Sequence, residues 1–321
     1  MAAGDAAEAA GARLISGGGR VDHASVLAGA EAGAVCFAES EAALAGAGAP
    51  ALVLTTRALA AAAAEACPNA ALAVTKRPKL AFARLASRLH RSLTEGAWPE
   101  GTAMVAPGAS VHPSAVLGAG AVVGEACVVG PYAIVGPGTV LGPGCRLGPH
   151  ASVGHAVLGQ ACVLSAGVRV GEAGFGYAPG EAGAVAVPQL GRVILGDHVD
   201  LGANTTVDRG ALGDTVIGEG TKIDNLCHVA HNCRLGRHVL VAGQTGLSGS
   251  VVIGDGARIG GQVGMADHLT IGEGAVITAR SGLMKNVPAG ERWGGFPARP
   301  ARRWMKETAT LARLAREGEK R

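Results

Sequence analysis

The sequence predicts a mainly β protein whose largest part is a parallel β-helix of six-residue repeats. Between residues 217 and 283 every sixth residue is aliphatic, at twelve consecutive positions: Ile217, Ile223, Val229, Leu235, Val241, Leu247, Ile253, Ile259, Met265, Ile271, Ile277 and Leu283. Neither the helical nor the strand periodicity produces a repeat of six. Hexapeptide repeats build a parallel β-helix in which each repeat supplies one short strand and one corner, and three repeats make one triangular coil.

Composition agrees with this fold class. The 321 residues include 52 glycines, which suit a chain that turns a corner every few residues. Aromatic residues make up only 3%, which is enough for an interior filled by stacked Val, Ile and Leu. The net charge of +3 is too small to indicate a nucleic-acid partner.

Residues 1–103 lack the repeat and predict a small α/β domain. Short apolar runs at 34–37, 51–54 and 71–74 read as strands. An Ala-rich helix is expected over 57–67, and a second helix is expected from Pro78 to about Ser92. The turn-rich segment 98–101 marks the exit from this domain.

Residues 104–288 form the predicted β-helix, and residues 289–321 a basic helical extension. The period holds from Val105 to Val153, drops one residue, and continues to Val170. It breaks over 175–191, which we interpret as a loop leaving a corner, and again briefly over 208–216.

The cysteines and the N-terminus indicate the compartment. Seven cysteines form no CxxC pair, and Cys127, Cys145 and Cys162 fall on repeat positions, where Cys is a small apolar filler. The start Met-Ala-Ala-Gly-Asp has no basic segment followed by an apolar run, so we expect no signal peptide. No apolar stretch is long enough to span a membrane. We therefore expect a cytoplasmic protein.

Histidines at the corners are the candidates for chemistry. A zinc site of the kind found in β-helical carbonic anhydrases would need His112, His150 and His155 to converge. His112 and His150 are 38 residues apart rather than two coils of 18, and they occupy different repeat positions, so we expect no metal site.

His231 lies in a more suggestive setting. Gly249 is 18 residues later, one coil above it, and His268 is expected roughly 10 Å up the same edge, because stacked strands are ~4.8 Å apart. A base, a backbone N–H on a glycine and a second polar side chain on one edge suit acyl transfer. Three corner residues brought together by chance would look the same.

Several motifs resemble a known family. They are Gly-Phe-Gly-Tyr at 174–177, Val-Pro-Gln-Leu-Gly at 187–191, Thr-Thr-Val-Asp-Arg-Gly-Ala-Leu at 205–212, Ile-Asp-Asn-Leu at 223–226 and Ala-His-Asn at 230–232. Together with the order of the segments, they resemble the UDP-3-O-acylglucosamine N-acyltransferases of lipid A biosynthesis. The resemblance implies a left-handed β-helix and a homotrimer with active sites between neighbouring subunits.

The resemblance also implies the reaction. The donor would be a 3-hydroxyacyl chain on the phosphopantetheine of acyl carrier protein, the acceptor the 2-amino group of a UDP-3-O-acyl-glucosamine, with no cofactor and no metal. His231 would be the general base and the N–H of Gly249 would meet the oxyanion. Acyl carrier protein is acidic, so it would dock on Arg299, Arg302, Arg303 and Lys306.

Other residues are expected to contact substrate. His268 and the Asp224-Asn225 pair are candidates, although Asp224 could equally cap a corner. The family holds uracil with a Phe-x-x-Asn-x-x-Tyr pattern; Phe37 matches, but Ser40 and Ala43 depart from it. Gly282 and Met284 would lie at the far end of the acyl groove, or would only turn a corner and fill the end of the β-helix.

Two alternatives remain open. A sister O-acyltransferase acting on UDP-N-acetylglucosamine shares the β-helix and the histidine, but it lacks an N-terminal α/β domain. A structural β-helix without chemistry would not need the Asp-Asn-Leu and Ala-His-Asn motifs.

Overall fold

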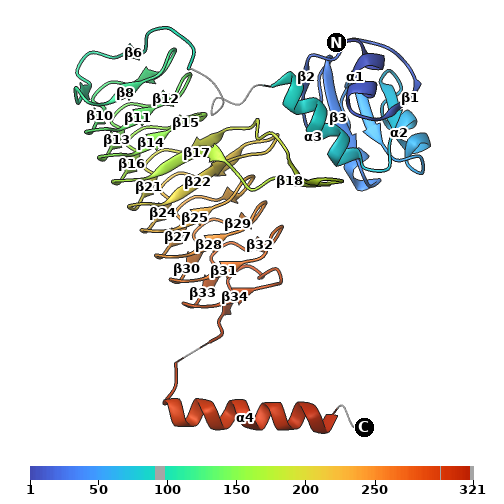
Figure 1. The fold of residues 1–321 in the computed structure, drawn as a ribbon. Helices are drawn as coiled ribbons and strands as arrows, with labels where there is room; N and C mark the ends of the chain where they lie inside the picture. The colour runs from blue at the N-terminus through green and yellow to red at the C-terminus, as the bar shows by residue number, and fades with distance from the viewer. Residues whose placement is uncertain (91–97, 297, 319–321) are drawn as a thin grey trace.

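The computed structural model describes residues 1–90, 98–296 and 298–318. An N-terminal domain lies beside a long stack of coils, and a C-terminal helix follows the last coil (Figure 1). The fold class predicted from the sequence is confirmed: the largest part of the chain is a parallel β-helix.

The N-terminal domain is a five-stranded sheet with the order β1-β5-β4-β3-β2. Its strands are β1 (Arg13–Ser16), β2 (His23–Ala24), β3 (Ala34–Ala38), β4 (Leu52–Thr55) and β5 (Ala71–Val74). Its helices are α1 (Ala3–Ala9), α2 (Ala60–Ala66) and α3 (Pro78–Leu89), with a 3-10 turn η1 (Ala42–Leu44). The sequence analysis missed α1, β1 and β2, because short, Ala-rich or mostly exposed segments carry little hydrophobic periodicity.

Helix α3 shows why its segment is helical. Pro78 occupies the first turn, where its missing N–H costs nothing, and the apolar side chains of Leu80, Phe82 and Leu85 are buried. The side chain of Glu39 accepts a hydrogen bond from the Lys79 N–H at 3.2 Å, which satisfies one of the free donors of the first turn.

Three parallel sheets form the triangular β-helix, called the prism below. The first sheet contains β7 (Ser110–Val111), β10 (Val128–Val129), β13 (Arg146–Leu147), β16 (Val163–Leu164), β21 (Asp200–Leu201), β24 (Lys222–Ile223), β27 (Leu240–Val241), β30 (Arg258–Ile259), β33 (Val276–Ile277) and β35 (Arg292–Trp293). The second contains β8 (Val116–Leu117), β11 (Ile134–Val135), β14 (Ser152–Val153), β17 (Arg169–Ala173), β22 (Thr206–Arg209), β25 (His228–Val229), β28 (Gly246–Leu247), β31 (Gly264–Met265) and β34 (Gly282–Leu283). The third contains β6 (Met104–Val105), β9 (Val122–Val123), β12 (Val140–Leu141), β15 (Ala156–Leu158), β20 (Val193–Leu195), β23 (Thr215–Ile217), β26 (Arg234–Leu235), β29 (Val252–Ile253) and β32 (Thr270–Ile271).

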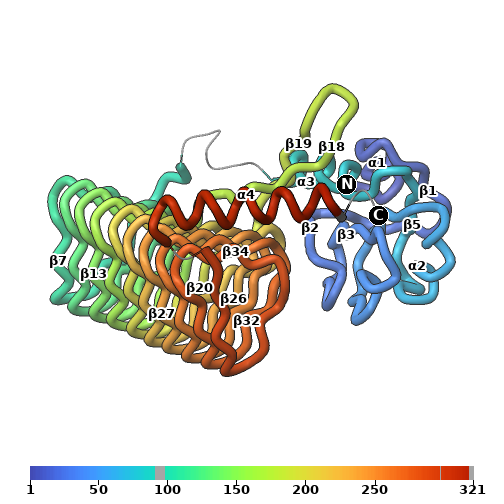
Figure 2. The backbone as a smooth tube through the Cα atoms, turned by 90° about the horizontal axis from the view of Figure 1, so that it is seen from below, coloured from blue at the N-terminus to red at the C-terminus, as the bar shows by residue number. Residues whose placement is uncertain are grey.

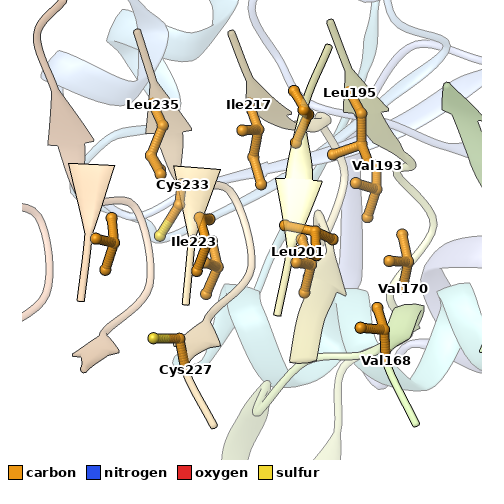
Figure 3. Packing of buried hydrophobic residues seen from close by; sticks show 14 of the residues in the cluster. Val168, Val170, Val193, Leu195, Leu201, Ile217, Ile223, Cys227, Cys233 and Leu235 are labelled. Carbon is orange, nitrogen blue, oxygen red and sulfur yellow. The ribbon is translucent and has the colours of Figure 1, made fainter. Parts of the chain in front are cut away.

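The repeated aliphatic residue fills the interior of the prism. All twelve positions from Ile217 to Leu283 are buried, and equivalent residues on successive coils pair in register, as Val229 does with Leu247. Figure 3 shows the side chains converging from different sheets, among them Leu201 and Leu235. Burying one such side chain contributes roughly 1.5–3 kcal/mol, so the stacked column holds the coils together.

Buried corner positions add a second stabilising pattern. The Sγ of Cys233 donates to the Ser248 carbonyl at 3.1 Å, and the Oγ1 of Thr221 donates to the Gly236 carbonyl at 2.9 Å. Each donor lies one coil before its acceptor. Cysteine and threonine therefore play the same part here, and Cys227 and Cys233 are packing residues.

A β-hairpin leaves the prism within the segment that the sequence analysis treated as a loop. Strands β18 (Tyr177–Gly180) and β19 (Gly183–Ala186) are antiparallel and project toward the N-terminal domain (Figure 2). Ala178 and Val187 are buried in the same hydrophobic cluster as Phe82 of α3. The hairpin thus joins the N-terminal domain to the coil that precedes the His231 region.

The C-terminal helix α4 (Ala301–Gly318) is amphipathic and largely exposed. Trp304, Met305, Leu311 and Leu314 are each more than half exposed. Arg299 and Arg303 form ion pairs with Glu307. None of the described helices combines the length and the apolar character that crossing a membrane demands.

Candidate active site

His231 lies at the edge of the prism where the chain passes from β25 to β26. Glycines flank its ring on both sides. A Cβ on Gly174 would lie 2.8 Å from the His231 Cβ, and a Cβ on Gly249 would lie 2.7 Å from Cε1 and 2.9 Å from Nε2. Any larger residue at either position would push the imidazole out of place, so the two glycines define where this side chain can lie.

Asn232 determines which nitrogen of His231 carries the proton. The Asn232 Oδ1 accepts a hydrogen bond from the Ala211 N–H at 3.0 Å, and Nδ2 donates to the Gly213 carbonyl at 3.2 Å. This network identifies the oxygen of the amide. The His231 Nδ1 is 3.1 Å from that oxygen and must donate to it. The lone pair is left on Nε2, the nitrogen next to Gly249.

Gly249 and His268 continue the same edge, as the repeat predicted. The N–H of Ser250 donates to the His231 carbonyl, and the N–H of His268 donates to the Gly249 carbonyl, both at 3.0 Å. Within the described part of the chain, the Gly249 N–H makes no hydrogen bond. The edge therefore offers a free backbone donor beside an available imidazole nitrogen.

A buried carboxylate lies one strand before the histidine. Asp208 is 8% exposed, and its Oδ2 is 3.7 Å from the His228 Nε2. The His228 Nδ1 is 2.8 Å from the Thr206 Oγ1. Burial raises the pKa of Asp208, while the adjacent His228 and His231 oppose that rise.

A strip without side chains runs along the outer face of the prism from His228. Gly246, Gly264 and Gly282 occupy the outward position on the next three strands of the same sheet. A Cβ at any of the three would meet no atom within 4 Å. Gly282 therefore lies on an open face rather than at a corner, and Met284, 80% exposed, does not fill the end of the prism.

Asp224 and Asn225 lie at a different edge from His231. The Asp224 carboxylate accepts hydrogen bonds from the Asn225 N–H at 2.7 Å and the Gly243 N–H at 3.1 Å. The Asn225 Oδ1 accepts from the Ala203 N–H at 2.6 Å. Within one chain both residues cap corners, and it is Asn232 rather than Asp224 that contacts the His231 ring. Substrate contact by Asp224 and Asn225 stays a prediction.

Phe37 lies at the end of β3 and is half-buried. Its ring packs against Phe82, with the ring centroids 5.0 Å apart. Ser40 caps the following turn through its hydroxyl, which accepts from the Ala43 N–H at 3.3 Å. Uracil binding at Phe37 stays a prediction, and the neighbouring segment supplies no second aromatic ring because residue 43 is alanine.

The three histidines considered for zinc lie apart. His112 contacts Ser114, and His150 stacks on Tyr132 with 5.1 Å between ring centroids. His155 lies on the edge that also carries His231. Among the described residues, no three or more His, Cys, Asp or Glu side chains are grouped so that they could hold a metal ion.

Sequence reasoning missed Gly174, Asn232, Asp208 and His228. Gly174 and Asp208 were only quoted within motifs. Both lie next to insertions between coils, where the six-residue count cannot predict the neighbour one coil away. Asn232 is the next residue after His231. Its side chain can accept a hydrogen bond, and that property beside a candidate base could have identified it from the sequence.

Known proteins are similar to this chain over most of its length. A UDP-3-O-acylglucosamine N-acyltransferase from Caulobacter sp. (strain K31) is 50% identical over 317 residues, covering 96% of this chain and 92% of that protein. The chain belongs to this acyltransferase family. The enzyme of the same name from Caulobacter vibrioides is 62% identical over 166 residues, which is 52% of this chain and 49% of that protein.

Matches to two repeat models fall within residues 100–249, and a solved structure is similar to part of this chain. Residues 214–249 match a bacterial transferase hexapeptide model of six repeats, and residues 100–212 match a model of the GMPPB C-terminal domain. The UDP-N-acetylglucosamine acyltransferase from Campylobacter jejuni is 26% identical, with a TM-score of 0.50 over 56% of this chain and 68% of its own.

Proposed function

We propose that this enzyme transfers a 3-hydroxyacyl chain from acyl carrier protein to the 2-amino group of a UDP-3-O-acyl-glucosamine, as a cytoplasmic homotrimer in lipid A biosynthesis. The observation that carries the proposal is the His231 environment: Nε2 is the available nitrogen, and it lies beside the free N–H of Gly249. The family membership supplies the substrate class.

Each residue of the edge has a defined part in this reaction. The amine attacks the thioester carbonyl, a C–N bond forms, and the amine proton passes to the His231 Nε2. The Gly249 N–H donates to the oxyanion of the tetrahedral intermediate. When the C–S bond breaks, the proton on His231 can pass to the departing thiolate. The amine is the nucleophile, so no acyl-enzyme is required.

The N-terminal domain favours N-acylation over the sister O-acyltransferase reaction. The similarity to the Campylobacter jejuni enzyme covers 56% of this chain, whereas the similarity to the Caulobacter N-acyltransferase covers 96%. Incubation with an acyl carrier protein donor and each UDP-sugar distinguishes the three candidate functions. An amide product indicates the N-acyltransferase, an ester product the O-acyltransferase, and no product a structural β-helix.

Replacing His231 tests the mechanism. His231→Ala should reduce turnover by roughly 10²–10⁴-fold, because a positioned base is lost, and it should leave the melting temperature nearly unchanged since the ring lies outside the prism. His112→Ala, at an exposed corner near the start of the prism, is the matched control and should retain activity. Near-normal turnover in a folded His231→Ala enzyme would contradict the mechanism.

We further propose that α4 docks acyl carrier protein. Arg299 and Arg303 are paired with Glu307, whereas Arg302 and Lys306 take part in none of the ion pairs within the described residues. Reversing the charge at Arg302 and Lys306 should raise the KM for the carrier protein several-fold at low salt and leave the KM for the UDP-sugar unchanged. Arg146→Glu, on the prism, is the control. Equal effects on both substrates would count against docking.

A further inference from the structure

Asp208 is a buried carboxylate without a permanent cation beside it. Among the described residues it contacts no lysine or arginine, and its only ion-pair partner is His228 at 3.7 Å. A carboxylate this poorly exposed is unfavourable unless a positive charge compensates it. The groups that could supply that charge are two histidines, each of which can be neutral.

The topology places Asp208 one coil before the segment that carries the candidate base. Val207 pairs with Val229, so the residues that follow on β22 run along the coil directly before His231. On its other side Asp208 pairs with Glu172 of β17. Other charged or titratable groups nearby, among the described residues, include Arg209, whose Nε donates to the Gly191 carbonyl, His155 on the earlier coil, and the buried Cys233 thiol.

His228 holds the carboxylate from the exposed side. Its Nδ1 is fixed by the Thr206 hydroxyl, and its Nε2 points to Asp208. Half of the His228 side chain is exposed, whereas only 12% of the Asp208 side chain is. His228 therefore contacts the carboxylate directly, while His231, three residues later, is close enough for its charge to interact with the carboxylate.

We propose that Asp208 is a positioning residue that compensates the positive charge acquired by His231 when it accepts the amine proton, and that His228 holds the carboxylate in place. The inference rests on the proposed function. When the proton reaches His231, its ring becomes a cation one coil above Asp208. The carboxylate already lies in place, so it stabilises the transition state in which this positive charge develops.

The test is a pH profile of three variants, measured by amide formation with saturating acyl carrier protein donor. Asp208→Asn keeps the shape but removes the charge. We expect kcat to fall by about 10- to 100-fold, because a nearby opposite charge changes the pKa of its partner by about one to two units. The KM values should stay unchanged. The acid limb of the pH profile should move to lower pH, because the protonated His231 is no longer stabilised by a negative charge.

His228→Gln should act in the opposite direction. A neutral amide can still bond to Thr206, so the carboxylate remains and serves His231 alone; the acid limb should then move to higher pH. This shift should vanish when Asp208→Asn is already present, because the two residues act on the same charge. Glu219→Gln is the control, an exposed carboxylate at a different edge of the prism, and should change kcat less than about twofold.

The outcomes separate this inference from the proposed function. If His231→Ala abolishes turnover but Asp208→Asn leaves kcat and the acid limb unchanged, only the role of Asp208 is wrong. A purely structural role would lower the melting temperature and leave the acid limb in place, which would also overturn it. If Asp208→Asn does not fold, the His228→Gln variant tests the inference by itself. An acid limb that stays in place or moves to lower pH in that variant would refute the inference.

Discussion

His155 and His231 occupy the same position of the repeat on two different coils. Each lies two residues after a buried valine of the same sheet, Val153 and Val229, and each therefore reaches the same edge of the prism. Their surroundings differ. His155 lines a cavity with Trp98 and Glu172, whereas glycines flank the His231 ring on both sides.

The chemical consequence is visible at His155. Burial, with a smaller contribution from Arg209, lowers the pKa of His155 to about 4. Its ring makes no hydrogen bond to another side chain among the described residues, whereas Asn232 holds the His231 ring by Nδ1. The repeat determines where a histidine is placed, and the neighbours on adjacent coils determine whether it can act as a base.

Among the changes that test this comparison between the two coils, the largest effect is expected from adding one methyl group beside His231. Gly249→Ala would bring a Cβ within 2.7 Å of the ring, and displacing the base and the adjacent N–H should cost roughly 10²–10³-fold in kcat. Gly154→Ala, next to His155, has no atom within 4 Å of the new Cβ and should retain activity. Equal activities of the two folded variants would break the comparison between the coils.

A smaller effect is expected on the open glycine strip. Gly282→Met should shorten the preferred donor chain by a few carbons, because one methylene in an apolar site is worth about 1–3 kcal/mol. Competition between 3-hydroxyacyl carrier proteins that differ by two carbons measures the preference. Val276→Met places the same side chain on another face of the same coil and serves as the control. An unchanged preference in active Gly282→Met enzyme would remove this residue from the groove.

The smallest effect concerns the pH dependence of stability that results from burying His155 in its neutral form. Its pKa is lowered from 6.5 to about 4 in the folded chain, so the unfolded chain binds the proton more readily between these values. Stability should be intact above pH 6.5 and decline as the pH falls toward 4. His155→Gln should flatten that decline by a few °C in melting temperature, measured by calorimetry. A steeper decline in the variant would show that burial of His155 is not its cause.

The sequence predicted the parts of the site that the repeat connects. His231, Gly249 and His268 are separated by whole coils or nearly so, and counting residues was enough to bring them to one edge. Counting failed where the chain leaves the prism. Gly174 precedes the β18–β19 hairpin and Asp208 precedes another insertion, so their partners one coil away are not 18 residues away.

By itself, the sequence determined the parallel β-helix, because an aliphatic residue at every sixth position can be buried only if the chain coils with that period. It also determined the edge that carries His231. Only the tertiary structure decided what each histidine there can do. The proton position on His231, the burial of Asp208 and the lowered pKa of His155 depend on side chains from neighbouring coils and insertions, and these distances are not encoded in the period.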